Sequence, residues 1–440
     1  MKRKKTVNGF SKQSKERKLE WIAENCFDDS ENAIKEFQSY WLSDTELQNT
    51  YDRISENTIS NFILPYGVAP NFIINDQPYV IPMVIEESSV VAAAANAAKF
   101  WKTKGGFRAE VLSTEKIGQI HFYWSGDTAI LLEAREAFYA ELLHVSQSFT
   151  ENMKKRGGGI LGLEIRTFEE EPEYHQFLIR FETCDSMGAN FINSILENFA
   201  DQLDRVFTKI LGAECELPDV LMSILSNYTP HCIVKAEVSC SLNDLKHPGI
   251  SGADFATNFK KAVDIARIDP YRATTHNKGI FNGIDAVVLA TGNDFRAIEA
   301  AGHAYAARDG RYRSLSQCNI EDDIFHFELT LPIAVGTVGG LTHIHPLARR
   351  SLEMLGEPDA HTLMKIIASA GLAQNFAAIR SLITTGIQKG HMKMHLINIL
   401  NHLDATSGEI DQAIRFFKDK VISFSMVRSY LAQIRMDQNK

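Results

Sequence analysis

Two adjacent carboxylates stand where the sequence predicts the start of a helix. Glu86 and Glu87 precede the run VVAAAANAAKFWK, with Ser89 just before it and two glycines after it. A serine before an alanine-rich run and a glycine after it are typical start and stop signals of a helix. A carboxylate there feels the positive end of the helix dipole, which favours its ionised form, whereas burial would keep it protonated as an acid. From these residues alone, the pair either performs acid–base chemistry or only stabilises the first helical turn.

A second set of polar residues surrounds an apolar run, in HNKGIFNGIDAVVLATGND. Lys278 and Asp294 lie near opposite ends of this segment, and the run GIDAVVLATG between them has the pattern of a buried strand. We expect a turn to bring the two together as a charge pair. A lysine in such surroundings is either paired or used in catalysis. A purely structural bridge is the alternative.

Histidines are spaced in two places as if they shared one face of an element. His391 and His395 in GIQKGHMKMH are four residues apart, which puts both on one side of a helix. The glutamate of a zinc-binding HExxH motif is absent, and no third ligand is near. His343 and His345 alternate as on a strand, again without further ligands. We therefore expect no metal, and we expect the glycine-flanked His391 segment to be a flap that carries an acid to a site.

The segment DSMGAN, residues 185–190, is a candidate phosphate site. Gly188 leads into the predicted helix FINSILENFADQL, whose free amides could hold a phosphate. An ordinary capped helix start explains the segment equally well. Because no GxGxxG follows a strand, a Rossmann fold is not indicated.

The elements that position these residues fall into distinct stretches. Residues 13–55 read as helical, and residues 59–82 as short strands broken by turns. From about residue 112, a β–α–β–β–α order predicts a small inserted α+β unit. The last eighty residues or so are nearly all helical.

Composition sets the outer limits. A chain of 440 residues predicts two or three domains. The net charge of −9 argues against general nucleic-acid binding. The six cysteines are scattered, as in reduced cytosolic proteins. The basic N-terminus lacks the apolar stretch of a signal peptide, and no apolar run is long enough to span a membrane.

Taken together, these segments resemble the class II 3-hydroxy-3-methylglutaryl-coenzyme A (HMG-CoA) reductases. The similar segments include SENTISNFILPYGVAPNFIIN, EESSVVAAAANAAK, DSMGAN, HNKGIFNGIDAVVLATGNDFRAIEAAGHAYA, LPIAVGTVGG and AGLAQNFAAIRSLITTGIQKGHMKMH. The HNKG…TGND and GLAQN…GHM segments are specific, because no general constraint of folding would put them together in this order.

The resemblance implies an α+β fold with two domains and a flap. Residues 1–112 and 228–385 would form a large, thioester-binding domain. Residues 113–227 would form a small nicotinamide-binding domain, ferredoxin-like rather than Rossmann. Residues 386–440 would form the helical C-terminal flap. The family is at least dimeric, with the active site at the subunit interface, and we expect a cytoplasmic enzyme without nucleic-acid or membrane partners.

By motif position, the resemblance also implies three groups of site residues. The residues implied as catalytic are Glu87, Lys278, Asp294 and His391. Those implied to bind HMG-CoA are Ser89, Arg272, Asn282, Gln374 and Asn375. Those implied to bind the cofactor are Asp185, Met187, Gly188, Asn190 and Gly162.

The implied chemistry is a reduction of HMG-CoA to mevalonate and coenzyme A by two hydrides, or the reverse oxidation. Lys278 would stabilise the oxyanion formed by the first hydride, as an oxyanion hole does. His391 would protonate the departing thiolate, and Glu87 would protonate the aldehyde oxygen in the second step. Asp294 would tune Lys278 and Glu87 through a shared network, so that the three titrate together.

Cofactor choice depends on the stretch GGGILGLE. Relatives that prefer NADH can carry an aspartate where Gly162 aligns, and that carboxylate would repel a 2′-phosphate. Gly162 removes this repulsion, and the basic residues 154–156 lie just upstream. We therefore favour NADPH over NADH. The basic residues could also be only a solvated helix end.

The sequence departs from the family motifs at two turns. Ser60 replaces a glycine and Ser88 a proline, which puts turn geometry in doubt more than catalysis. His343 stands where a lysine is common. Two other functions stay open, namely a redox-free coenzyme A ester lyase or hydratase and a non-catalytic protein that binds such esters. The DSMGAN motif argues against the first, and the retained catalytic set against the second.

Overall fold

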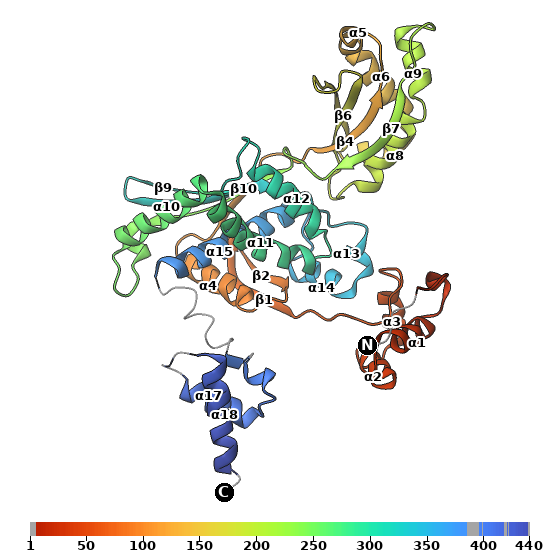
Figure 1. Ribbon diagram of the computed structural model, residues 1–440. Coiled ribbons are helices and arrows are strands. Elements are labelled where there is room, and N and C mark those ends of the chain that lie inside the picture. Colours follow the sequence, from red (N-terminus) through yellow and green to blue (C-terminus); the bar gives the residue numbers. More distant parts are fainter. Residues whose placement is uncertain (1–5, 385–395, 398, 418–419, 421, 439–440) are drawn as a thin grey trace.

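The computed structural model describes residues 6–384, 396–397, 399–417, 420 and 422–438. Figure 1 shows the described residues in separate groups. We call them the N-terminal helices (residues 10–52), the large unit (residues 66–111 and 233–383), the small unit (residues 116–226) and the C-terminal helices (the described residues from 396 on).

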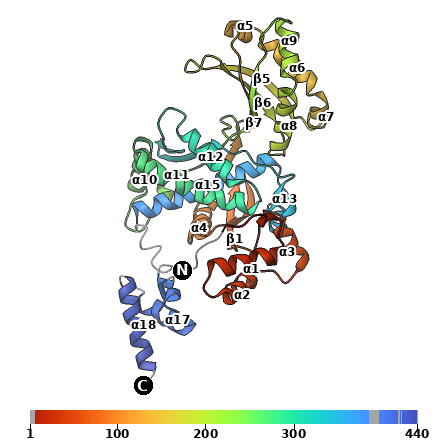
Figure 2. The ribbon, with the colours of Figure 1, turned by 45° about the vertical axis from the view of Figure 1, so that its right-hand side comes forward.

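The chain begins with short helices that lean on the large unit. They are η1 (Phe10–Lys12), α1 (Lys15–Cys26), α2 (Ser30–Ser39) and α3 (Thr45–Asp52). The three α-helices each begin at a side chain that accepts an amide hydrogen bond, as N-cap residues commonly do. The Tyr51 ring meets His345 at 5.1 Å, and Figure 2 shows these helices beside β1 and α13.

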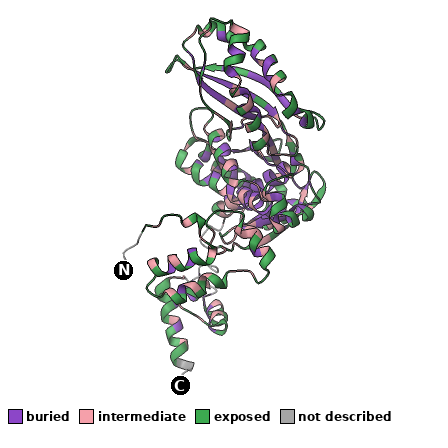
Figure 3. Ribbon diagram, turned by 90° about the vertical axis from the view of Figure 1, so that its right-hand side faces the viewer, coloured by how far each residue is buried: buried purple, intermediate pink, exposed green. Residues whose placement is uncertain are grey.

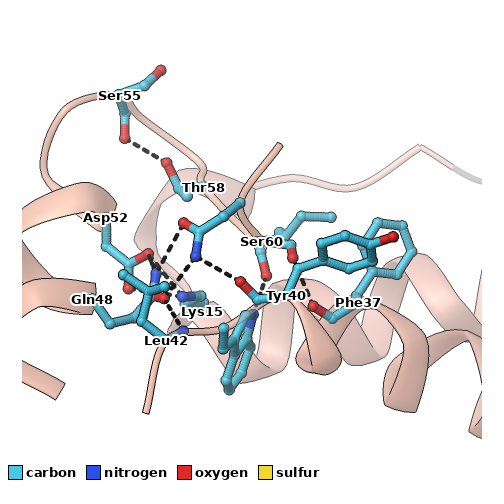
Figure 4. Close-up of polar contacts among 12 residues, drawn as sticks. Lys15, Phe37, Tyr40, Leu42, Gln48, Asp52, Ser55, Thr58 and Ser60 are labelled. Carbon is cyan, nitrogen blue, oxygen red and sulfur yellow. Dashed lines mark hydrogen bonds and ion pairs between the residues drawn. The ribbon is translucent and has the colours of Figure 1, made fainter. Parts of the chain in front are cut away.

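Polar contacts fix the segment that follows these helices. The Ser60 hydroxyl donates to the Phe37 carbonyl oxygen at 2.6 Å (Figure 4). The Asn61 side-chain amide donates to the Tyr40 carbonyl oxygen at 2.7 Å. The serine that replaces a glycine at position 60 therefore ties the segment to α2.

A hairpin and an antiparallel sheet form the framework of the large unit. Strands β1 (Tyr66–Ile74) and β2 (Gln77–Val84) pair with each other, and α4 (Val90–Lys102) packs on β1. The four-stranded sheet has the order β3-β8-β10-β9 and consists of β3 (Arg108–Val111), β8 (Ile233–Ser241), β10 (Ile324–Pro332) and β9 (Ser316–Glu321). A glycine-rich turn follows β10.

Helices surround this framework. After β8 come η2 (Leu242–Leu245), α10 (Gly252–Ile268), α11 (Pro270–Ala290) and α12 (Phe295–Ala306). After β10 come α13 (Leu341–Ile344), α14 (Pro346–Met354) and α15 (Ala360–Ile383). Helix α15 is long and apolar enough to cross a membrane, but 72% of its most apolar window is buried in the structure, so it is a core helix. Figure 3 shows the buried residues gathered in this centre.

The central helices α11 and α15 cross at glycines. A Cβ at Gly283 would lie 2.7 Å from the Ala370 carbonyl oxygen, and one at Gly371 would lie 2.7 Å from the Ile284 side chain. Both distances are too short for a real contact, so only glycine lets the two helices approach this closely.

The expected strand GIDAVVLATG is wrong, because these residues form the second half of α11. The helix begins at Asp269, whose side chain caps the first amides, with Pro270 in the first turn. Its second half is buried on nearly every side, so the sequence shows no amphipathic period there. A continuous apolar run fits a buried helix as well as a buried strand.

The small unit has the expected ferredoxin-like order. Its elements are β4 (Lys116–Tyr123), α5 (Thr128–Glu133), α6 (Arg135–Val145), α7 (Gln147–Lys154), β5 (Gly159–Thr167), β6 (Tyr174–Glu182), α8 (Ala189–Ala200), α9 (Leu203–Leu211) and β7 (Asp219–Ser226). The antiparallel sheet has the order β5-β6-β4-β7 and encloses an apolar core of its own. The predicted α+β fold class is confirmed.

The two connections between the units run side by side. The Leu112 amide donates to the Ile233 carbonyl oxygen at 2.8 Å, and the Ile233 amide donates to the Ser113 carbonyl oxygen at 2.8 Å. The chain therefore leaves the large unit and returns to it at nearly the same point.

The C-terminal helices have a third, small core. Helix α17 (Ser407–Phe416) begins with a capping box between Thr406 and Glu409, and α18 (Phe424–Gln438) packs against it. The guanidinium of Arg435 donates to Glu409 at 2.7 Å across the two helices. These contacts fit the helical pattern expected of the C-terminal region.

Candidate active site

Helix α11 and the loop before α4 bring a lysine and a glutamate into contact. Lys278 and Asn282 are one turn apart on α11 and face the same way. The Lys278 ammonium lies 2.5 Å from a Glu87 carboxylate oxygen, and the Asn282 amide donates to the same oxygen at 3.3 Å. The lysine and glutamate side chains remain 60% and 41% exposed, so both can be reached by a ligand.

Ser89 stands at the start of α4 in a conformation that few residues adopt. Its φ of 73° is left-handed, and its side chain makes no capping hydrogen bond. The predicted helix start is confirmed, since Ser89 is the N-cap residue of α4, and Glu87 precedes the helix rather than lying in its first turn. Non-glycine residues in this region cluster at functional sites, where the surrounding structure holds them.

These residues line one cavity of about 790 Å³, which we call the α11 cavity. Seven of the predicted site residues border it, and they are Glu87, Ser89, Arg272, Lys278, Asn282, Gln374 and Asn375. A second cavity of similar volume lies between α2 and residues 59–63, and none of the predicted site residues lines it. Helices α4, α11 and α15 thus gather the expected catalytic and substrate-binding residues, apart from Asp294 and His391.

Arg272 is a positively charged residue of the α11 cavity that forms no ion pair with a described carboxylate. Its side chain is about half buried, and burial lowers the pKa of the guanidinium. Within the described part of the chain, no carboxylate lies within salt-bridge distance of it. Because a partly buried cation is costly unless it is paired, this arrangement favours an anionic ligand.

Asn375 and Gln374 form part of the cavity floor. The Asn375 side-chain oxygen accepts a hydrogen bond from Ser316 at 2.8 Å, and Ser316 in turn contacts the His276 ring at 2.7 Å. Burial, together with the nearby Arg272, lowers the pKa of His276 to about 3, so this histidine is neutral. The buried Gln374 side-chain oxygen has no hydrogen-bond partner among the described residues.

Arg380 is a cavity residue that the sequence analysis missed. It lies near the end of α15, donates to Asn96 at 2.6 Å and stacks on Phe100 and Phe376. An arginine in an otherwise apolar helix was the available signal, because a charge there needs a partner or a function.

Asp294 does not meet Lys278 as expected. It caps α12, contacts Arg296 at 2.8 Å and is 45% exposed. Lys278 and Ala290 are twelve residues apart on one continuous helix, or about 18 Å. The turn that would have paired them within one chain is absent, because the intervening segment is helical.

The DSMGAN segment lies where the small and large units touch. The Asp185 carboxylate accepts a hydrogen bond from the Ala360 amide at 2.9 Å, at the start of α15, and the Asp185 carbonyl oxygen accepts from the Thr337 amide at 2.9 Å. Gly188 precedes α8 with a φ of 92°, and Asn190 lies exposed in the first turn. A Cβ at Gly336 would lie 2.5 Å from the Met187 amide nitrogen. The absence of a side chain at Gly336 therefore lets its backbone pack directly against the backbone of the DSMGAN segment.

Gly162 lies under an arginine. It follows a β-bulge in β5 and pairs with Arg180 on β6. A Cβ at position 162 would lie 2.7 Å from an Arg180 guanidinium nitrogen, and that guanidinium donates to Glu115 at 3.2 Å. The missing side chain therefore leaves room for a half-exposed positive group.

The predicted histidines are arranged differently from expectation. His391 and His395 lie outside the described residues. His343 lies in α13 and His345 accepts a hydrogen bond at the start of α14, so they do not share a strand face. The described residues contain no group of three or more possible metal ligands.

Comparisons with known proteins agree with this geometry. A sequence profile of the family described as hydroxymethylglutaryl-coenzyme A reductase matches residues 14–396. The chain is 35% identical to 3-hydroxy-3-methylglutaryl-coenzyme A reductase from Archaeoglobus fulgidus, over 98% of this chain and 94% of that protein. It is 34% identical to a probable reductase of the same name from Borreliella burgdorferi, over 92% and 94%.

The chain belongs to the hydroxymethylglutaryl-coenzyme A reductase family.

Solved structures identify the class within the family. The chain is similar to the class II HMG-CoA reductase from Streptococcus pneumoniae, which was solved bound to NADPH in open conformations. That similarity has 38% identity and a TM-score of 0.72, and it covers 86% of this chain and 100% of the other. The class II resemblance seen in the motifs is confirmed. A redox-free lyase or hydratase, or a non-catalytic ester-binding protein, finds no support among these relatives.

Proposed function

We propose that the chain reduces HMG-CoA to mevalonate and coenzyme A in the mevalonate pathway, with the chemistry in the α11 cavity. The observation that carries this proposal is the contact between Lys278 and Glu87 beside the unpaired Arg272. Lys278 and Glu87 can supply a positive charge and a proton to a thioester carbonyl, and Arg272 can bind a carboxylate. Together they suit a substrate that has both a thioester and a free carboxylate.

The cavity residues suit distinct tasks. Arg272 holds the substrate carboxylate, and Ser89, Asn282, Gln374 and Asn375 hold its hydroxyl and shape the floor. Lys278 stabilises the oxyanion that forms at the thioester carbonyl. Glu87 delivers a proton to the aldehyde oxygen in the second step, and His391 protonates the departing thiolate.

The chain's own residues fit a nicotinamide cofactor, and we favour NADPH. The amides at the start of α8, with Asn190 beside them, suit a pyrophosphate, because a helix N-terminus attracts anions. Arg180 over Gly162 offers a guanidinium to a 2′-phosphate. Each cofactor molecule would supply one hydride, so two molecules must bind in turn. The S. pneumoniae relative was solved with NADPH.

Asp294 has a different place in this proposal from the one expected. Its exposed carboxylate pairs with Arg296, and it follows the end of α11, which lies about 18 Å along the helix from Lys278. We infer that it serves the site of a second copy, in a homodimer or higher oligomer whose active sites lie at the interface. The large domain (1–112 and 228–385) then binds the thioester, the small domain (113–227) binds the cofactor, and residues 386–440 close over the site.

A cytoplasmic location completes the proposal. The six scattered cysteines are all unpaired thiols in the structure, as in a reducing compartment.

One assay tests the reaction. The protein is mixed with HMG-CoA and either NADPH or NADH, and cofactor absorbance and released thiol are both followed. We expect two NADPH oxidised for each thiol released, and no oxidation without the thioester. Thiol release without cofactor oxidation would contradict the proposal, because it would indicate a lyase or hydrolase.

Arg180→Ala tests cofactor choice separately. We expect kcat/KM with NADPH to fall at least tenfold, or about 1.4 kcal/mol, while kcat/KM with NADH stays the same. Arg166→Ala, which removes an exposed arginine from the neighbouring strand, is the matched control. Equal losses with both cofactors in Arg180→Ala would show that Arg180 does not select the phosphate.

A further inference from the structure

Helix α11 carries a third polar residue below the Lys278–Glu87 contact. Asp285 is seven residues beyond Lys278 and three beyond Asn282, so the three lie along one face of the helix. One Asp285 carboxyl oxygen is completely buried and has no hydrogen-bond partner among the described residues. A buried carboxylate oxygen in this state is costly, and each such group in a folded protein needs an explanation.

The explanation lies on α12, which packs against α11. The rings of Phe281 and His303 meet at 4.8 Å, which aligns the two helices. Glu299 is four residues before His303, as Asp285 is four after Phe281, so the same packing brings the two carboxyl groups together, and a side-chain hydrogen bond with Glu299 contributes to the raised pKa of Asp285. Two carboxylates cannot form a hydrogen bond unless one of them carries a proton.

Burial and the nearby acidic groups favour the protonated form of Asp285. Burial and the negative charge of Glu299 raise the pKa of Asp285 to about 8, and Glu86 adds to this effect. Lys278 opposes it from two turns away. On the far side of Glu299, His303 contacts the Tyr312 hydroxyl at 2.7 Å, and burial lowers the pKa of this histidine.

We propose that Asp285 and Glu299 share one proton and are positioning residues for Glu87. The argument rests on the proposed function, in which Glu87 acts with Lys278. While Asp285 and Glu299 hold one proton between them, the pair carries one negative charge rather than two. In this state the loop of Glu86 and Glu87 stays against α11. When the proton is lost, the new charge on Asp285 repels this loop and draws Glu87 away from Lys278.

The pH dependence of mevaldehyde reduction by NADPH tests the pair, because this half-reaction needs the Glu87 proton and releases no thiol. We expect wild-type kcat to fall above about pH 8, by roughly tenfold for each further pH unit. Asp285→Asn keeps the shape but cannot ionise, so this alkaline fall should disappear. Glu299→Gln removes the neighbouring charge, so the fall should move to lower pH. Asp264→Asn, at an exposed pair on α10, is the control and should leave the profile unchanged.

A readout without turnover separates this inference from the proposed function. Infrared spectra at neutral pH should show a protonated carboxyl band in the wild type that is missing in Asp285→Asn. A protein that has this band but oxidises no NADPH would contradict the proposed reaction and leave the shared proton intact. If the band is the same in both proteins, or if Asp285→Asn keeps the wild-type alkaline fall, the shared proton is wrong.

Discussion

Replacing Lys278 by alanine separates catalysis from folding. The lysine and its partner Glu87 are 60% and 41% exposed, and exposed ion pairs contribute only about 0–1 kcal/mol to folding. Alanine is also the residue that helices favour most, so α11 should form normally. We therefore expect the free energy of unfolding to change by less than about 1 kcal/mol.

The expected loss of activity is much larger. An ammonium about 4 Å from a developing oxyanion stabilises it by roughly 4 kcal/mol at the effective dielectric of a protein surface. Removing one such group commonly lowers kcat by about 10²–10³. Lys278→Ala should therefore lose at least 3 kcal/mol, roughly, of transition-state stabilisation, seen as a fall in kcat/KM of more than about a hundredfold.

The assay is steady-state oxidation of NADPH with HMG-CoA, combined with thermal unfolding of the same samples. Lys260→Ala is a matched control, because Lys260 forms an exposed pair with Asp264 at 2.6 Å on α10, away from the α11 cavity. The control should keep full activity. Turnover of Lys278→Ala within tenfold of the wild type, in a folded protein, would refute the assigned role of this lysine.

Three further predictions concern other parts of the chain. His391→Gln should cripple HMG-CoA reduction but spare reduction of free mevaldehyde, measured with both substrates; equal losses would exclude a leaving-group role. Gly283→Leu should destabilise the protein by about 1–3 kcal/mol in denaturant unfolding, because a side chain there meets the backbone of α15, whereas an unchanged midpoint would contradict the close helix crossing. Arg435 and the Thr406 amide lower the pKa of Glu409 to about 2, so the stability from this contact is present above about pH 4.5 and is lost as the pH falls toward 2. Protection factors from amide hydrogen exchange in α17 and α18 should fall over this pH range. In Glu409→Gln these protection factors should not change across the same range.

The small unit could be predicted from the sequence because its signals are local. Alternating apolar residues mark strand β6, and loops with glycine, proline or acidic residues separate the strands. The cavity residues could be predicted because the HNKG…TGND and GLAQN…GHM segments, which carry Lys278, Asn282, Gln374 and Asn375, resemble specific motifs of a known family. Both results depend on short stretches of sequence.

The errors arose where packing decides the structure. The second half of α11 is buried on nearly every side, so its apolar residues lost their helical period and were taken for a strand. The pair Asp269-Pro270 was a helix-start signal that could have corrected this. The separation of Lys278 from Asp294 followed from the same error. The contact of Asp285 with Glu299 could not be foreseen, because it requires the packing of α11 against α12.

The side-by-side connections at Leu112 and Ile233 have a consequence for how such a protein can be rebuilt. β3, the last strand before the small unit, pairs with β8, the first strand after it. The sheet of the large unit is therefore continuous at the point where the small unit is inserted. A short turn from Ser113 to Cys232 would therefore span the gap and leave the host sheet intact. The small unit, with its own core, is a detachable module with adjacent ends. The same site would accept a foreign domain of matching end-to-end distance, which makes the junction a natural place for recombination.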